Sequence, residues 1–259
     1  MNKKIYSRNG TLEFLRFVFC VCILLFHIEK EILGLSPLDN GIKIGFFTHG
    51  AIGVEFFFIL SGLFMAKSID SKRNKDEKND VGEDLWKFLI NKYKGFFIYH
   101  IIAFIFLFII TVVINEYNLS KILLTFIDSI PSIFLIQMTG IPCVAINHIE
   151  WYLSAMIISM AIIYPICKKY FNLFIKYIAP IFSILILGYL GYTYGYLTGV
   201  NVWTVFAFKG LIRGFAEIML GSFAYYLAKK LSEYKNNLNK YRILLTLLNG
   251  HYIYLLCYL

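Results

Sequence analysis

The stretch LEFLRFVFCVCILLFHI at residues 12–28 decides the fold class, because it is an apolar run close to the thickness of a bilayer. Arg16 and His27 lie eleven positions apart within it. In an α-helix this separation is about 16 Å and returns to within about 20° of the same direction, so both side chains share one face. Glu13 lies one turn before Arg16. Because ionisable side chains cost several kcal/mol in a membrane segment, we expect both residues to face protein or water and to be functional. The alternative is that Arg16 extends to the cytoplasmic interface and His27 lies at the outer one.

Composition and the rest of the sequence indicate a membrane protein throughout. The chain has 259 residues, of which 59% are hydrophobic, against about 45–50% in soluble domains. We predict an all-α polytopic transmembrane bundle of about 7–8 segments, forming one membrane-embedded domain over residues 1–259. Besides 12–28, the predicted segments are 47–66, 96–114, 122–138, 151–167, 174–197, 206–228 and 241–259.

The net charge of +9 is interpreted as a signal of membrane topology. Basic residues cluster at segment ends, which is typical of contact with anionic lipid and gives no indication of nucleic acid. Lys3, Lys4 and Arg8 predict a cytoplasmic N-terminus in a multi-pass protein of the cell (plasma or inner) membrane. The loop at residues 67–95 is then cytoplasmic, and its interior from 70 to 84 is predicted to be solvated.

Strict alternation of the segments conflicts with the charge pattern. It places Lys168, Lys169 and Lys176 outside, against the positive-inside rule. If segment 122–138, which contains Asp128 and Pro131, does not fully cross, these lysines return inside. We therefore favour a re-entrant or interfacial segment there.

The remaining ionisable residues give weaker signals. The five cysteines have no metal-site spacing, so we expect neither a metal nor a structural disulfide. Glu55, in the outer half of the second segment, needs a partner, and we weigh two: His27, or backbone groups if the carboxyl is protonated. His100, at the start of the third segment, is expected to be interfacial.

Two motifs resemble the acyltransferase 3 family of integral-membrane O-acyltransferases. One is the Arg16-x10-His27 spacing, and the other is Gly-Val-Glu-Phe-Phe-Phe-Ile-Leu-Ser-Gly-Leu-Phe at residues 53–64. Later, Trp-Tyr-Leu at 151–153 and Arg213 with Gly221 are similar to family elements. The family's basic motif before its third helix is altered, since Lys92 and Gly95 replace paired arginines and Ile98 replaces a proline.

The resemblance implies transfer of an acyl group, commonly acetyl, from acyl-CoA to a hydroxyl of an extracytoplasmic carbohydrate. Acetyl-CoA is then a co-substrate, and no bound cofactor is expected. Arg16, Lys92 and Lys94 would bind the polyanionic donor. His27, aided by Glu55, would act as the base or carry the acyl group covalently.

His148 and Trp151 lie at a predicted external boundary of the fifth segment, where we expect them to contact the acceptor sugar. The alternative for Trp151 is an interfacial aromatic-belt residue, which is the more common role of a tryptophan at such a boundary. Family members usually continue for further helices, so we expect C-terminal helices to be missing from this sequence.

Two alternative hypotheses remain at this point. Intramembrane Arg, Glu and His residues also suit a non-enzymatic transporter or flippase of a lipid-linked saccharide. The altered basic motif and the abrupt end of the last segment are also compatible with an inactive truncated remnant.

Overall fold

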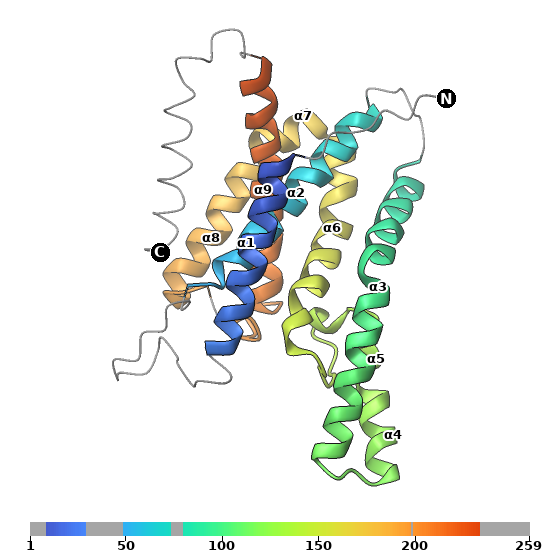
Figure 1. The fold of residues 1–259 in the computed structure, drawn as a ribbon. Coiled ribbons are helices and arrows are strands. Elements are labelled where there is room, and N and C mark those ends of the chain that lie inside the picture. Colours follow the sequence, from blue (N-terminus) through green and yellow to red (C-terminus); the bar gives the residue numbers. More distant parts are fainter. Residues whose placement is uncertain (1–8, 30–48, 74–79, 198, 234–259) are drawn as a thin grey trace. The chain divides into compact units, whose positions relative to one another are not determined.

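A computed structural model describes residues 9–29, 49–73, 80–197 and 199–233 of the chain (Figure 1). The described part is helical, and five of its helices are long and apolar enough to cross a membrane. The expected helical membrane bundle is therefore confirmed. The predicted segment 241–259 lies outside the described residues. The chain divides into two compact units, residues 1–57 with 233–259 and residues 58–232, which are described separately below.

The first unit contains α1 (Gly10–His27) and the beginning of α2 (Ile52–Arg73). The Asn9 side chain caps α1 by accepting a hydrogen bond from the Thr11 amide at 3.1 Å. The Phe19 and Phe56 rings stack with their centroids 4.4 Å apart. A Cβ on Gly53 would lie 2.8 Å from the Ile23 side chain, so this glycine allows α1 and α2 to approach closely.

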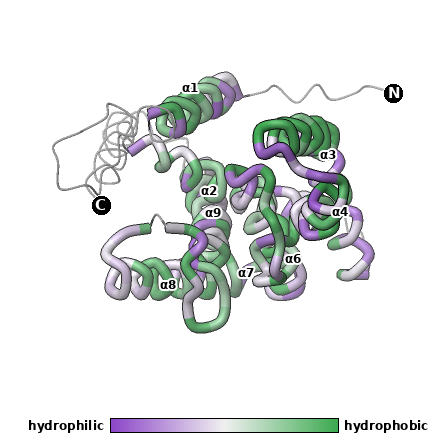
Figure 2. Tube along the Cα trace, turned by 90° about the horizontal axis from the view of Figure 1, so that it is seen from below, coloured by the Kyte–Doolittle hydropathy of each residue, from purple (hydrophilic) through white to green (hydrophobic). Residues whose placement is uncertain are grey.

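The second unit contains the rest of α2 and all later helices. α3 and α8 are mostly apolar along their length (Figure 2), and much of their surface is exposed, as expected for helices that face lipid. The elements are α3 (Val81–Ile114), α4 (Leu119–Asp128), α5 (Ile130–Ile133), η2 (Gln137–Thr139), η3 (His148–Glu150), α6 (Trp151–Lys169), α7 (Phe171–Leu173), the π-helical turn η4 (Phe174–Ile178), α8 (Ala179–Tyr194) and α9 (Lys209–Glu233).

α2 and α9 cross at direct backbone contact. A Cβ on Gly62 would lie 2.0 Å from the Ile218 carbonyl oxygen, and one on Gly221 would lie 1.9 Å from the Ile59 carbonyl oxygen. No side chain larger than hydrogen fits at either position. α9 is less apolar than its neighbours because protein rather than lipid covers much of it.

The predicted segment 122–138 is broken into short helices. α4 has ten residues, about 15 Å of helix, which is half the thickness of a hydrocarbon core. Pro131 lies in the first turn of the next short helix, which begins at Ile130, and Leu135 has a positive φ of 55° just after that helix ends. This agrees with a segment that does not cross the membrane as one helix.

The expected loop at residues 67–95, with a solvated interior from 70 to 84, is wrong for the residues that the structure describes there, and residues 74–79 lie outside them. α2 continues to Arg73 and α3 already begins at Val81, where the Asp80 side chain caps it by accepting from the Gly82 amide. Asp70 and Asp84 are buried. Their charges predicted exposure to water. In the structure, the two carboxylates lie near helix ends and pair with lysines of other helices.

Basic side chains gather where α2, α6 and α9 end and α3 begins, and we call this the cationic end. Asp84 accepts from Lys72 at 3.3 Å and also from Lys168, while Asp70 accepts from Lys229 at 2.5 Å. Lys168 therefore lies on the same side as Lys72, which resolves the conflict with strict alternation. The cationic end consists of Lys72, Arg73, Lys168, Lys169, Lys176, Lys229 and Lys230.

Candidate functional site

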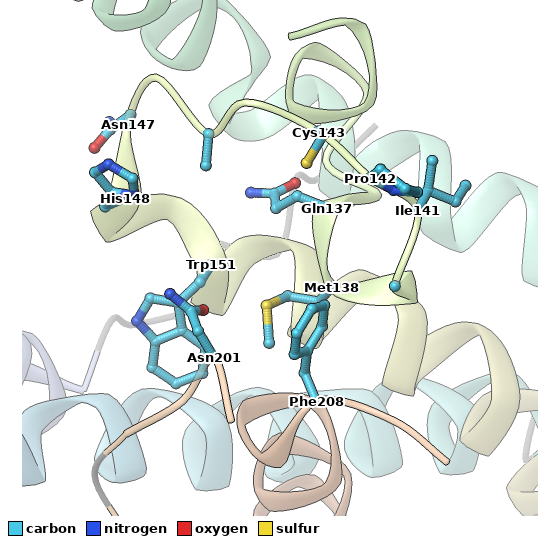
Figure 3. A pocket seen from close by; sticks show the side chains of 12 residues that line it. Gln137, Met138, Ile141, Pro142, Cys143, Asn147, His148, Trp151, Asn201 and Phe208 are labelled. Carbon is cyan, nitrogen blue, oxygen red and sulfur yellow. The ribbon is translucent and has the colours of Figure 1, made fainter. Parts of the chain in front are cut away.

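The second unit contains a cavity of about 320 Å³ at the start of α6 (Figure 3). Its volume lies at the lower end of the range of about 300–1,000 Å³ that is usual for small-molecule sites. It is lined by Gln137, Met138, Gly140, Ile141, Pro142, Cys143, Ala145, Asn147, His148, Trp151, Asn201 and Phe208.

Both residues expected to contact the acceptor line this cavity. His148 opens η3, and Trp151 begins α6 directly after it, so the two side chains come from adjacent helical turns. The Asn147 side chain accepts from the Ile149 amide at 3.2 Å and so fixes the entry to η3. The Trp151 ring lies 5.9 Å from that of Phe58 on α2. The structure thus brings His148 and Trp151 to one concave site.

The opposite wall of the cavity was missed by sequence reasoning. Asn201 and Phe208 come from the connection between α8 and α9, some fifty positions after His148. Trp203 pairs with Phe208 in a short antiparallel bridge, and its ring lies 2.7 Å from where a Gly140 Cβ would stand. Gly140 has a φ of 92°, so it also supplies a left-handed turn. No local periodicity signals this contact, because its two sides come from connections far apart in the sequence.

The expectation that His100 is interfacial is wrong. Its side chain is buried, with Nδ1 2.8 Å from the Glu150 carboxylate and Nε2 3.0 Å from the Ile133 carbonyl oxygen. The cost of burying the polar imidazole is offset because both of its ring nitrogens have a hydrogen-bond partner. Glu150 lies between His148 and Trp151, so this pair anchors the cavity wall to α3 and α5.

Two further hydrogen bonds fasten the segment after α5 to α6. The side-chain amide nitrogen of Gln137 donates to the backbone carbonyl oxygen of Glu150 at 3.4 Å. The backbone amide of Met138 donates to the Ser154 hydroxyl at 3.1 Å. Both Gln137 and Met138 line the cavity. The cavity wall is therefore held by polar contacts within the bundle.

Cys143 is the titratable thiol of the cavity wall. It lies in the connection between η2 and η3, and burial raises the pKa of its thiol. A raised pKa keeps the group as the neutral thiol near pH 7, which is the less nucleophilic form. Cys143 therefore contributes a small apolar surface to the cavity.

Within the described part of the first unit, α1 packs against the beginning of α2 through Phe19 and Ile23. Ile23, which contacts α2 at Gly53, lies close to the direction of Arg16 and His27 around the helix. The Arg16 guanidinium is 2.6 Å from the Glu13 carboxylate, and its side chain is 37% exposed. The His27 ring contacts Phe26 edge-on at 5.3 Å. The side of α1 near Arg16 and His27 thus includes a residue that meets α2, and the functional role of these two residues stays a prediction.

Several expected site contacts stay predictions. Glu55 lies in the first turn of α2, and its pairing with His27 is untested. Lys92 and Lys94 lie within α3 in the second unit, whereas Arg16 lies in the first, so the donor cluster of these three residues also stays a prediction.

Three charged side chains near the start of α9, those of Lys209, Arg213 and Glu217, are buried and have polar partners. Arg213 Nε is 2.7 Å from the Glu217 carboxylate, and both side chains are buried. One turn earlier, the buried Lys209 donates to the Tyr196 carbonyl oxygen at 2.7 Å and lies over the Tyr196 ring. These contacts fix the connection that carries Asn201 into the cavity.

The fold defines a helical membrane protein, and its candidate site is a cavity whose wall includes a histidine, a tryptophan and side-chain amides. A family model described as an acyltransferase domain matches residues 9–259. The chain therefore belongs to the acyltransferase 3 family. No curated protein and no solved structure matches it.

Proposed function

We propose that the protein is a membrane O-acyltransferase that moves an acyl group, most simply acetyl, from acyl-CoA to a hydroxyl of an envelope or cell-surface carbohydrate. Family membership supports acyl transfer. One observation supports a carbohydrate as the acceptor. A single cavity is lined by an aromatic ring, an imidazole and three side-chain amides, which belong to Trp151, His148, Asn147, Asn201 and Gln137. An aromatic face and amide groups that both donate and accept suit a ring bearing several hydroxyls.

In the proposed reaction, His27 of α1 acts on the acceptor hydroxyl. A sugar hydroxyl is a weak nucleophile, so His27 takes its proton while the hydroxyl oxygen attacks the thioester carbonyl. The carbon–sulfur bond then breaks, and the CoA thiolate leaves and takes up the proton from the imidazolium. Alternatively the imidazole is first acylated with loss of the thiol, and the acyl group then passes to the hydroxyl. Glu55 orients the imidazole, and Arg16, Lys92 and Lys94 bind the donor phosphates.

The charge distribution supports the direction of transfer. The cationic end gathers seven basic residues, which the positive-inside rule assigns to the cytoplasm, where acyl-CoA is made available. The cavity lies at the other end of α6. We therefore place the protein in the cell membrane with donor binding on the inner side and acceptor binding further out.

The experiment uses the purified full chain in nanodiscs with radiolabelled acetyl-CoA and envelope glycan extracted from the host. We expect label in the glycan with the wild type and a loss of at least about a hundredfold with His27→Ala. His49→Ala is the matched control, because this exposed histidine precedes α2 and has no assigned role. Glycan that crosses the membrane without label would support the transporter instead. Full activity of the purified His27→Ala protein would overturn the site assignment.

A further inference from the structure

The position of the cavity along the bundle is fixed by contacts between α3 and α6. At the cationic end Asp84 pairs with Lys168, and one turn further Phe88 stacks on Tyr164 at 4.7 Å. At the other end of α6, His100 bonds Glu150, next to the cavity. The cavity therefore lies at the level of His100 on α3.

α3 does not end at this level. It continues for fourteen residues to Ile114, about 21 Å, and α4 folds back along it, with the Phe108 and Phe126 rings 5.9 Å apart. We call residues 101–128 the apolar hairpin. In Figure 1 it extends past the beginning of α6. Between residues 95 and 115 the sequence contains no Asp, Glu, Lys or Arg.

The apolar hairpin is covered with exposed hydrocarbon side chains. Eleven large apolar side chains are exposed on it, as is typical of a helix surface that faces lipid. Its exposed members are Ile102, Ile105, Phe106, Ile109, Val113, Ile114, Leu119, Leu123, Leu124, Phe126 and Ile127. We therefore expect the exposed side chains of the apolar hairpin to contact lipid.

The length of α3 then gives the depth of the cavity. The uncharged part of α3, from Gly95 to Ile114, is about 29 Å long, which matches the roughly 30 Å hydrocarbon core of a bilayer. Lys92 and Lys94 then mark one boundary of the hydrocarbon, toward the cationic end, and Glu116 and Lys121 mark the other at the tip of the hairpin. The cavity lies about 20 Å beneath that tip, at the level of the hydrocarbon.

The surroundings of the cavity match this depth. Uncharged residues make up the whole connection from 195 to 208, and Val205 and Phe206 within it are 81% and 75% exposed. We call the exposed apolar residues around the cavity the rim. The rim consists of Ile141, Val144, Ile149, Trp203, Val205 and Phe206.

We propose that the acceptor is a membrane-anchored molecule, a hydroxyl-bearing head on a lipid tail, which enters the cavity sideways from the bilayer while its tail lies along the rim. This inference rests on the proposed function for the reaction, but the depth of the cavity does not. A cavity that holds several amide groups and an imidazole, and that is bordered by exposed hydrocarbon side chains, favours ligands that are polar at one end and apolar at the other. A free water-soluble glycan lacks the second part.

The first test measures depth without any ligand. Trp203 is kept as the sole tryptophan by Trp86→Phe and Trp151→Phe, and its fluorescence is quenched in vesicles by lipids brominated in the acyl chain or by aqueous iodide. We expect strong quenching by brominated lipid and little by iodide. The reference is a chain with Trp86 alone, which is exposed near the cationic end of α3 and is expected to be quenched by iodide. Equal iodide quenching of both would overturn the placement.

The second test compares two acceptor probes with the same sugar head, a methyl glycoside and a long-chain alkyl glycoside in nanodiscs. We expect kcat/KM to be at least about tenfold higher for the alkyl glycoside. The double variant Val205→Ser with Phe206→Ser should lose that preference and leave the methyl glycoside unchanged.

Equal rates for both probes would overturn the inference and leave the proposed function standing. If neither probe accepts the acyl group, the carbohydrate acceptor is wrong, and the fluorescence test still decides the depth of the cavity.

Discussion

The His100 imidazole and the Glu150 carboxylate form a buried pair with Nδ1 and Oε2 2.8 Å apart. The other ring nitrogen meets the Ile133 carbonyl oxygen, which can only accept, so Nε2 carries a hydrogen. One proton is then shared between Nδ1 and the carboxylate. The pair joins α3 to the turn that holds His148 and Trp151, so it positions the cavity wall.

His100→Ala should destabilise the folded protein by about 3–5 kcal/mol, because it leaves the Glu150 carboxyl buried without the imidazole. The measurement is thermal unfolding of the purified protein in detergent. The double variant His100→Leu with Glu150→Leu removes both polar groups, so neither is left buried without its partner, and it should recover much of the loss. A single variant as stable as the wild type would show that the pair does not hold the wall.

Trp151→Ala should raise KM for the acceptor about tenfold or more with little change in KM for acyl-CoA, because the ring lines the acceptor cavity. Trp151→Phe keeps an aromatic face and should lie between the two. The control is Trp86→Ala, which removes an exposed tryptophan from the far half of α3. An equal change in both KM values would point to a general loss of structure.

Gly62→Ala should destabilise the bundle by about 1–3 kcal/mol, since the added Cβ would lie 2.0 Å from the Ile218 carbonyl oxygen and must push α2 away from α9. The readout is again the unfolding temperature in detergent. Gly188→Ala on α8 meets nothing within 4 Å and should be neutral or stabilising. If both substitutions behave alike, the close crossing of α2 and α9 is wrong.

Cys143 should be alkylated slowly at pH 7. Burial raises the pKa of this thiol, so its thiolate appears at a higher pH than that of a free thiol, and the rate should rise later as pH increases. Iodoacetamide labelling is followed on a chain in which the other four cysteines are serine, with glutathione as the reference. A rate profile that matches or precedes that of glutathione would contradict the burial of Cys143.

The early helices were predictable because their signals are local. Apolar runs of bilayer length placed α1 and α6 within a few residues. The shared face of Arg16 and His27 follows from helical geometry alone. Pro131 and Asp128 marked the segment that breaks into short helices, and the positive-inside rule identified the same segment by a separate physical argument.

Charge pairing between distant helices was not predictable in the same way. Asp70 and Asp84 looked like loop residues because charges usually face water, yet they accept from lysines on α9 and on α2 and α6. A charge is buried only when a partner removes the cost of desolvation, and that partner can be any distance away in the sequence.

By itself the sequence determined that the chain crosses a membrane as helices, and which face of the first helix carries its ionisable residues. Hydrophobic length and a 3.6-residue period act within one segment, so one sequence suffices to detect them. Only the tertiary structure decided that His100 forms a hydrogen bond with Glu150, and that Asn201 and Trp151 line the same cavity. It also decided that α3 extends beyond the beginning of α6. These relations depend on how separate helices are aligned along one another, which is set by side-chain contacts across the bundle.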